Sequence, residues 1–248
     1  MSETTTQSES EELQTEAEVG GMSVIDHLEE LRRRLIIIII AIAIGSTGAY
    51  FYAQELVHFI TLPAGKLYYL NPAEAFFTYL KVSFFAGFLL VLPIVLYQSW
   101  AFVVPALTNQ ERSTAIVLIP SSVLLFFAGL AFSYFFVLPA GIKFFMGFAT
   151  EDLQPMFSLG QYLSFVISFV LPFGFIFELP LFVLVLAKMG VIGSAFLIAK
   201  RKLVIVSAFV IGAVISPTPD IFSQSMVAIP MLVLYEISIL VVKYILRK

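Results

Sequence analysis

Glu30 is the first residue of this sequence whose type and position suggest chemistry, because an acid precedes a long apolar run there. It lies in His27-Leu-Glu-Glu-Leu-Arg-Arg-Arg-Leu35, where the leucines fall on one helical face and the charged residues on the others. A carboxylate in this position could bind an incoming cation. It could equally pair with Arg34, four residues later, for about 0.3–0.5 kcal/mol on an exposed helix. The segment alone leaves both interpretations open.

Glu178 is the second candidate, because it interrupts a long apolar segment at Phe175-Ile-Phe-Glu-Leu-Pro180. A charge at the centre of a bilayer costs about 2.5–3.5 kcal/mol, so this side chain must be neutral, paired or close to water. An acid inside a membrane span is a functional candidate by default. The alternative is structural: a protonated Glu178 would donate to a carbonyl that the kink at Pro180 leaves free.

The sequence lacks the side chains that most catalytic or metal sites require. It has two histidines and no cysteine. It contains no His-Glu-x-x-His, no Gly-x-Ser-x-Gly and no pair of intramembrane aspartates. We therefore expect no enzymatic activity, no metal site and no cofactor.

The composition places these candidates in a membrane protein. Hydrophobic residues make up 60% of the chain and charged residues 12%, with a mean hydropathy of +0.98, so a lipid bilayer is the expected surrounding. Residues 1–21 are rich in Ser, Thr, Glu and Gln and are predicted to form a disordered acidic tail, followed by a membrane domain over 22–248. The acids of the tail account for the net charge of −3, and no nucleic-acid partner is expected.

Apolar runs long enough to cross a bilayer predict an all-α protein with six transmembrane helices. The expected spans are residues 35–52, 76–100, 114–138, 161–187, 203–215 and 221–244. Pro139 is expected to end the third span. The fifth amounts to only about 20 Å of helix, so the last two helices are predicted to form a short hairpin. Prolines within the spans predict a kinked, curved bundle, with bends at Pro93, Pro120, Pro172, Pro180 and Pro230.

Basic residues gather in the segments that would share one side of the membrane, which predicts that both termini are cytoplasmic. They are Arg32, Arg33, Arg34, Arg112, Lys188, Lys200, Arg201, Lys202, Lys243, Arg247 and Lys248. Lys81 lies early in the second span and is expected to extend toward the opposite interface. In the turn Ser216-Pro-Thr-Pro-Asp220, the aspartate is placed to cap the last helix.

Several segments together resemble one family, TatC, the multispanning subunit of the twin-arginine protein translocase. They follow the order of the family across all six predicted spans: residues 27–35, Leu92-Pro-Ile-Val-Leu-Tyr-Gln-Ser-Trp-Ala-Phe-Val-Val-Pro-Ala-Leu107 with Glu111-Arg112, Phe177-Glu-Leu-Pro180, Ser216–Gln224 and Ala228-Ile-Pro-Met231. The resemblance implies a non-enzymatic receptor in a bacterial-type cytoplasmic membrane. Such receptors bind twin-arginine signal peptides of folded proteins, recruit single-span TatA-type and TatB-type subunits for export driven by the protonmotive force, and self-associate in a complex.

The resemblance also implies roles for individual residues. Signal-peptide binding falls on Glu30, Arg32, Phe102 and Glu111, and partner contact or translocation on Pro63, Glu178, Asp220 and Gln224. Glu30 and Glu111 would meet at the cytoplasmic face and accept the two guanidinium groups of the signal. The alternative from another class is a small secondary transporter or channel that uses Glu178 as an ion or proton site.

Overall fold

The computed structural model describes residues 24–64, 67–103, 109–150, 156–216, 218–244 and 246. Within these ranges, the side chains of residues 24–26, 63, 103 and 109–116 are not described. The predicted acidic tail therefore lies outside the described residues. Helices account for all the named secondary-structure elements of the described chain. The all-α prediction is confirmed.

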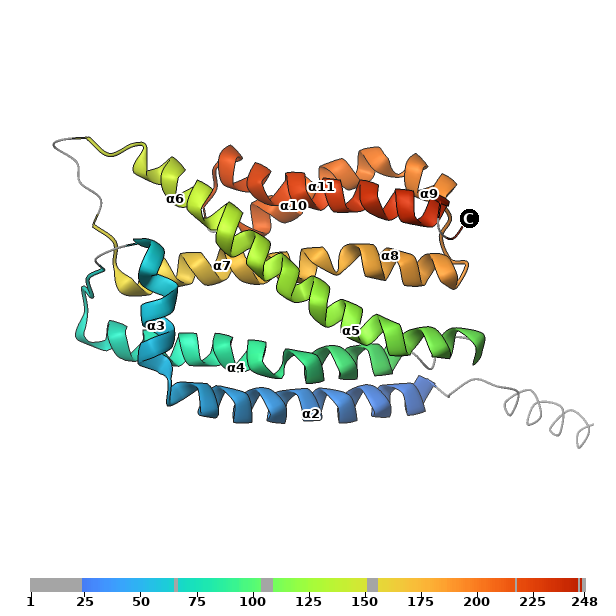
Figure 1. The fold of residues 1–248 in the computed structure, drawn as a ribbon, viewed down its shortest axis with the longest axis horizontal. Coiled ribbons are helices and arrows are strands. Elements are labelled where there is room, and N and C mark those ends of the chain that lie inside the picture. Colours follow the sequence, from blue (N-terminus) through green and yellow to red (C-terminus); the bar gives the residue numbers. More distant parts are fainter. Residues whose placement is uncertain are drawn as a thin grey trace, which may run out of the picture.

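The long helices run roughly along one common direction, with α5 and α6 crossing the others at a slant, whereas the short α3 runs across the end of the bundle (Figure 1). They are α2 (Val24–Tyr50), α3 (Ala53–Thr61), α4 (Pro72–Val103), α5 (Asn109–Phe132), α6 (Leu138–Met146), α7 (Leu159–Phe177), α8 (Leu179–Lys188), α9 (Ser194–Ala199), α10 (Arg201–Ile215) and α11 (Ile221–Tyr244).

Five segments of the described chain are long and apolar enough to cross a membrane. They are His27–Tyr50, Pro72–Phe102, Val117–Met146, Leu159–Lys188 and Ile221–Tyr244. The remaining expected span, the fifth in chain order, corresponds to α10, which has 15 residues and is as short as predicted. Its partner α11 has 24 residues, about 36 Å of helix, so the prediction that both of the last helices are short is wrong for α11.

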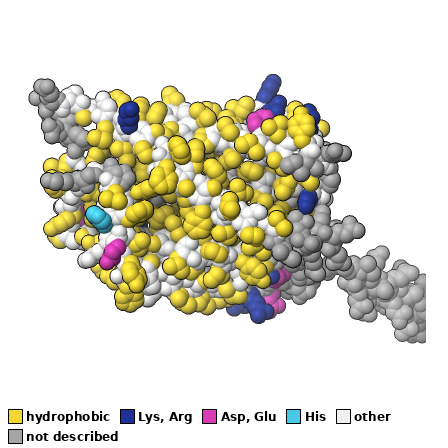
Figure 2. Space-filling model, viewed as in Figure 1, with side chains coloured by type: hydrophobic (Ala, Val, Ile, Leu, Met, Phe, Trp, Pro, Cys, Tyr) yellow, Lys and Arg dark blue, Asp and Glu magenta, His cyan; other side chains and the backbone are white. Residues whose placement is uncertain are grey.

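The surface matches a bilayer environment. Figure 2 shows hydrophobic side chains spread over the visible face, with most of the charged side chains near its two ends. Of the exposed hydrophobic side chains of the described chain, Ile44 and Leu124 are each 69% exposed. In water such a surface would be a large apolar patch, but against hydrocarbon it is favourable.

The first two long helices, α2 and α4, pack closely because each has a glycine where they cross, Gly45 on α2 and Gly87 on α4. A Cβ added to Gly87 would lie 2.3 Å from the backbone nitrogen of Ser46, and one added to Gly45 would lie 2.8 Å from the carbonyl oxygen of Gly87. Glycine therefore lets the two backbones touch, which is the way helices associate in lipid without a hydrophobic driving force.

The third span is longer than predicted, because Pro139 does not end it. The helix passes from α5 through a π-helical turn, Ser133–Val137, directly into α6. The π turn shifts the hydrogen-bond register just before Pro139, so the continuous helix accommodates a residue that has no N–H to donate. The Ser133 hydroxyl donates to the carbonyl of Phe169 on α7 at 3.2 Å, which ties this turn to the core.

Candidate functional site

The charged end of α2 brings Glu30 together with Arg34 and Gln98. Arg34 donates from Nε (3.0 Å) and Nη2 (2.5 Å) to Glu30 Oε1. Its remaining nitrogen, Nη1, donates to Oε1 of Gln98 on α4 at 3.0 Å. The helical pairing that the spacing allowed is therefore present, and α4 holds it in place.

This pairing uses only half of the Glu30 carboxylate. The second oxygen, Oε2, is buried and has no hydrogen-bond partner in the described structure. A buried, unpaired acceptor costs about 1–3 kcal/mol, and more when it carries charge. The site thus presents a carboxylate oxygen that a further donor would stabilise.

An aromatic contact lies at the same end of the bundle. The ring of Phe102, in the last turn of α4, stacks on His27 with a centroid distance of 4.3 Å and an interplanar angle of 19°. This contact adds to the packing between the start of α2 and the end of α4. Arg32 is exposed and forms no ion pair with the other side chains that the structure describes.

Glu111 lies in the first turn of α5, two residues after its start at Asn109. Its side chain is among those not described. The expected meeting of Glu30 with Glu111 therefore falls outside the described structure and stays a prediction.

Glu178 occupies the break between α7 and α8. It is the C-cap residue of α7 and the N-cap residue of α8, with φ −74° and ψ −18°, and its N–H donates to the carbonyl of Phe175 at 3.1 Å. Its Oε2 accepts a hydrogen bond from the Ser122 hydroxyl on α5 at 2.8 Å, whereas Oε1 is buried with no partner among the described groups. The structural alternative named a backbone carbonyl as the partner of Glu178, but the partner is a hydroxyl from another helix.

Asp220 caps α11 as predicted, because its Oδ1 accepts the N–H of Ser223 at 2.8 Å. Burial acts to raise the pKa of Asp220, but hydrogen bonds from Thr218 and Ser223 outweigh it and hold the pKa below its ordinary value. Gln224 follows one residue after Ser223, and its N–H donates to the Asp220 carbonyl at 3.1 Å. Its backbone packs against α10, where a Cβ on Gly212 would lie 2.9 Å from the Gln224 carbonyl oxygen.

Pro63 lies in the short 3-10 turn Leu62–Ala64 that follows α3, and its side chain is not described. The predicted residues whose side chains the structure describes lie in three places. Glu30, Arg32 and Phe102 lie at the end of the bundle where α2 begins, and Glu178 lies at the break between α7 and α8, inside the span Leu159–Lys188. Asp220 and Gln224 lie at the turn between α10 and α11.

The sequence alone did not identify Gln98, which accepts from the arginine of the Glu30–Arg34 pair, or Ser122, which donates to Glu178. Gln98 and Ser122 are polar residues within apolar spans, at QSW and PSS, and that local polarity was the available signal. A further ion pair joins the last two helices: Nη2 of Arg201 on α10 lies 2.5 Å from Oε2 of Glu236 on α11.

Known proteins match this sequence and this fold. Residues 26–230 match the family model "Sec-independent protein translocase protein (TatC)". A protein of that name from Carboxydothermus hydrogenoformans is 40% identical over 92% of this chain and 95% of its own, and one from Aquifex aeolicus is 43% identical over 92% and 97%. The crystal structure of a "Twin Arginine Translocase Receptor" superposes with a TM-score of 0.79 at 44% identity, covering 88% of this chain and 98% of that one.

These similarities extend over nearly the whole described bundle, so they apply to the receptor function as well as to the fold. They support this function over the alternative that the chain is a small secondary transporter or channel. The chain belongs to the TatC family, the non-enzymatic receptor component of the Sec-independent, twin-arginine protein translocase.

Proposed function

We propose that this chain binds twin-arginine signal peptides at the end of the bundle formed by the start of α2, the end of α4 and the start of α5. Glu30 and Glu111 are the two acceptors for the paired arginines, and Phe102 and Arg32 flank them. The observation that carries this proposal is the half-used carboxylate of Glu30, with one oxygen on Arg34 and the other buried and unpaired.

The chemistry of this carboxylate favours a guanidinium ligand. Arg34 already occupies Oε1 with the planar donor geometry that an arginine of a signal peptide would offer. An incoming arginine would take Oε2 and compete with Arg34 for Oε1. Lysine is a poor substitute because an ammonium group cannot donate in the same two-pronged way. Each charge-assisted hydrogen bond contributes about 1.5–3 kcal/mol when shielded, and less where water has access.

We place this end of the bundle in the cytoplasm. The run Arg32–Arg34 at the start of α2 lies at the same end as Lys188, at the end of α8, and Arg201, at the start of α10. Lys143, in the last turn of α6, lies at the other end. This bias follows the positive-inside rule and supports a bacterial-type cytoplasmic membrane with both termini on the cytoplasmic side.

Glu178 is proposed to act later, as a polar contact for a helix of a TatA-type or TatB-type single-span partner, or for the inserted signal peptide. Its unpaired Oε1 supports this role, because an unsatisfied acid oxygen within a span favours a donor from outside the chain. Asp220, Gln224 and Pro63 are proposed to contribute to partner contact and translocation at the opposite end, within a complex that contains more than one copy of this chain.

Photo-crosslinking tests the binding site directly. A photoreactive phenylalanine derivative at position 102 keeps both acids and replaces one aromatic ring with another. We expect it to crosslink a twin-arginine signal peptide and not its twin-lysine variant. Glu30→Gln and Glu111→Gln should each abolish this crosslink.

Glu29→Gln is the matched control, because Glu29 is an exposed neighbour of the same charge on another face of α2. It should leave the crosslink unchanged. Equal crosslinking by the arginine and lysine peptides, or equal losses in Glu29→Gln and Glu30→Gln, would overturn the assignment. A thermal unfolding curve for each variant shows whether the bundle is intact.

A further inference from the structure

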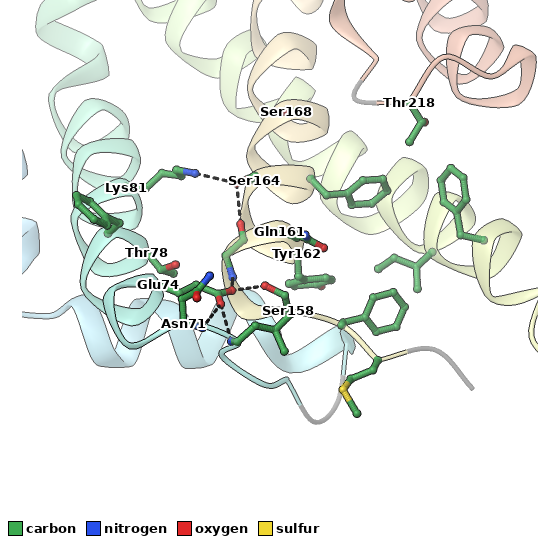
Figure 3. A pocket seen from close by; sticks show the side chains of 18 residues that line it. Asn71, Glu74, Thr78, Lys81, Ser158, Gln161, Tyr162, Ser164, Ser168 and Thr218 are labelled. Atoms are coloured by element: carbon green, nitrogen blue, oxygen red, sulfur yellow. Dashed lines mark hydrogen bonds between the residues drawn. The ribbon is translucent and has the colours of Figure 1, made fainter. Parts of the chain in front are cut away.

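A cavity of about 770 Å³ lies at the end of the bundle away from Glu30, between the first half of α4, the start of α7 and the end of α6. Its walls differ in character, as Figure 3 shows. Lys81, Thr78 and Ser164 supply polar groups on one side, and Phe77, Phe145 and Phe165 supply apolar surface. Its volume is in the range of roughly 300–1,000 Å³ that is typical of small-molecule sites.

Glu74 is the one acid among the described residues of this wall, and it is fully engaged by other groups. Its Oε1 accepts hydrogen bonds from the Ser158 hydroxyl and from the N–H of Gly160 at 2.7 Å. Its Oε2 accepts from the N–H groups of Leu70 at 2.7 Å and Asn71 at 3.3 Å. Glu74 therefore joins the start of α4 to the start of α7, and its oxygens are not free to neutralise a cation deeper in the cavity.

Lys81 is that cation. It lies nine positions after the start of α4, about 13 Å along the helix. Its ammonium group donates to the Ser164 hydroxyl at 2.8 Å, and that hydroxyl donates to the Gly160 carbonyl at 2.7 Å. The sequence predicted that Lys81 would extend to the interface, but it reaches across to α7 instead.

This arrangement leaves the ammonium group incompletely satisfied. An ammonium group has three N–H donors, and the hydrogen bond that Lys81 forms within the described part of the chain uses one of them on a neutral acceptor. No carboxylate of the described chain lies within ion-pair distance of it. The Lys81 side chain is exposed, so its charge faces the open side of the cavity. A positive charge inside a membrane-spanning helix is stabilised by water or by an anion, and an anion next to Lys81 would accept from the donors that Ser164 leaves free.

The apolar walls restrict what that anion can be. A small inorganic anion would leave the three phenylalanine side chains facing empty space. A molecule with an anionic group at one end and hydrocarbon at the other would fill both parts, and the surrounding bilayer supplies such molecules. We propose that this cavity binds an anionic phospholipid, with its phosphate at Lys81 and Ser164 and an acyl chain along Phe77, Phe145 and Phe165.

Lipid retention by the purified full-length protein tests this proposal. Phosphatidylglycerol and phosphatidylcholine with the same acyl chains are offered, and bound lipid is counted by native mass spectrometry. We expect the wild-type protein to retain the anionic lipid at least tenfold better than the zwitterionic one. Lys81→Gln should reduce its retention to the level of phosphatidylcholine.

Lys143→Gln is the matched control, because it removes the same charge from the same end of the bundle at an exposed position outside the cavity wall. It should preserve the preference. Equal retention of the two lipids by the wild-type protein, or equal losses in the two variants, would overturn the proposal by showing that only general surface charge acts. Displacement of the lipid by glycerol phosphate alone would also overturn it, because the acyl chain would then not matter.

A second measurement needs no substitution and decides the matter if Lys81→Gln fails to fold. Phosphatidylglycerol with a photoreactive acyl chain is added to the wild-type protein, and the labelled peptides are identified. Label at Phe77, Phe145 or Phe165 supports the site. Label confined to other lipid-facing positions would refute it. This site uses none of the residues proposed to bind signal peptides, so either proposal can fail without the other.

Discussion

Replacing Arg34 by glutamine should strengthen the binding of a twin-arginine signal peptide. In the structure, Arg34 donates two hydrogen bonds to the Glu30 oxygen that an incoming guanidinium would compete for. The variant removes this internal competitor, and a shorter amide side chain remains beside Gln98.

The size of the effect follows from the exposure of the pair. The side chains of Arg34 and Glu30 are 21% and 22% exposed, so the pair is shielded from water more than a typical surface pair. Exposed helical pairs contribute about 0.3–0.5 kcal/mol, and charge-assisted hydrogen bonds in shielded places contribute about 1.5–3 kcal/mol. A partly exposed pair falls between these two ranges. Removal of a competitor of about 0.5–1.4 kcal/mol corresponds to a gain of about two- to tenfold in affinity.

The assay is fluorescence anisotropy of a labelled signal peptide with the purified protein in nanodiscs, at one fixed salt concentration. Arg33→Gln is the control, because it removes the same charge one residue away from an exposed side chain that forms no ion pair in the described structure. The gain in Arg34→Gln must exceed that in Arg33→Gln. A loss of affinity in Arg34→Gln, with Arg33→Gln unchanged, would refute the competition and show that Arg34 positions Glu30 for the ligand.

Three further changes test the structure. Gly87→Leu should lower the thermal unfolding temperature markedly, because even a Cβ there meets Ser46 backbone at 2.3 Å, whereas Gly48→Ala, with nothing within 4 Å, should not. Ser122→Ala should cost about 1–3 kcal/mol in unfolding free energy by leaving the acid at position 178 without its donor, and this cost should shrink in a Glu178→Gln background; equal costs in both would contradict the pairing. Asp220→Ala should cost about 1 kcal/mol through the lost cap, and Asp220→Asn much less. The pKa of Asp220 is depressed in the folded protein, so the stabilisation by its charge is present above the ordinary aspartate pKa and is lost as the pH falls through the folded pKa. The unfolding free energies of wild type and Asp220→Asn should therefore converge only in acid.

The sequence determined the features that depend on neighbours along the chain. Apolar runs located the five long spans and the short α10, because hydrocarbon thickness sets the length of a helix directly. The Glu30 to Arg34 pair and the Asp220 cap were also predictable, since both join residues within one helical turn. The error at Pro139 has a local cause as well: a π turn allowed the helix to continue, and no simple residue pattern predicts such a turn.

Only the tertiary structure decided which distant residues complete each polar site. Ser122 reaches Glu178 from 56 positions away, Gln98 reaches Arg34 from 64, and Ser164 reaches Lys81 from 83. Within lipid, any polar group must find its partner inside the protein or in a ligand, but the apolar helix faces around it do not specify which helix supplies that partner. The crossings that choose it depend on close backbone contacts such as the one at Gly87, which exist only once the helices have packed.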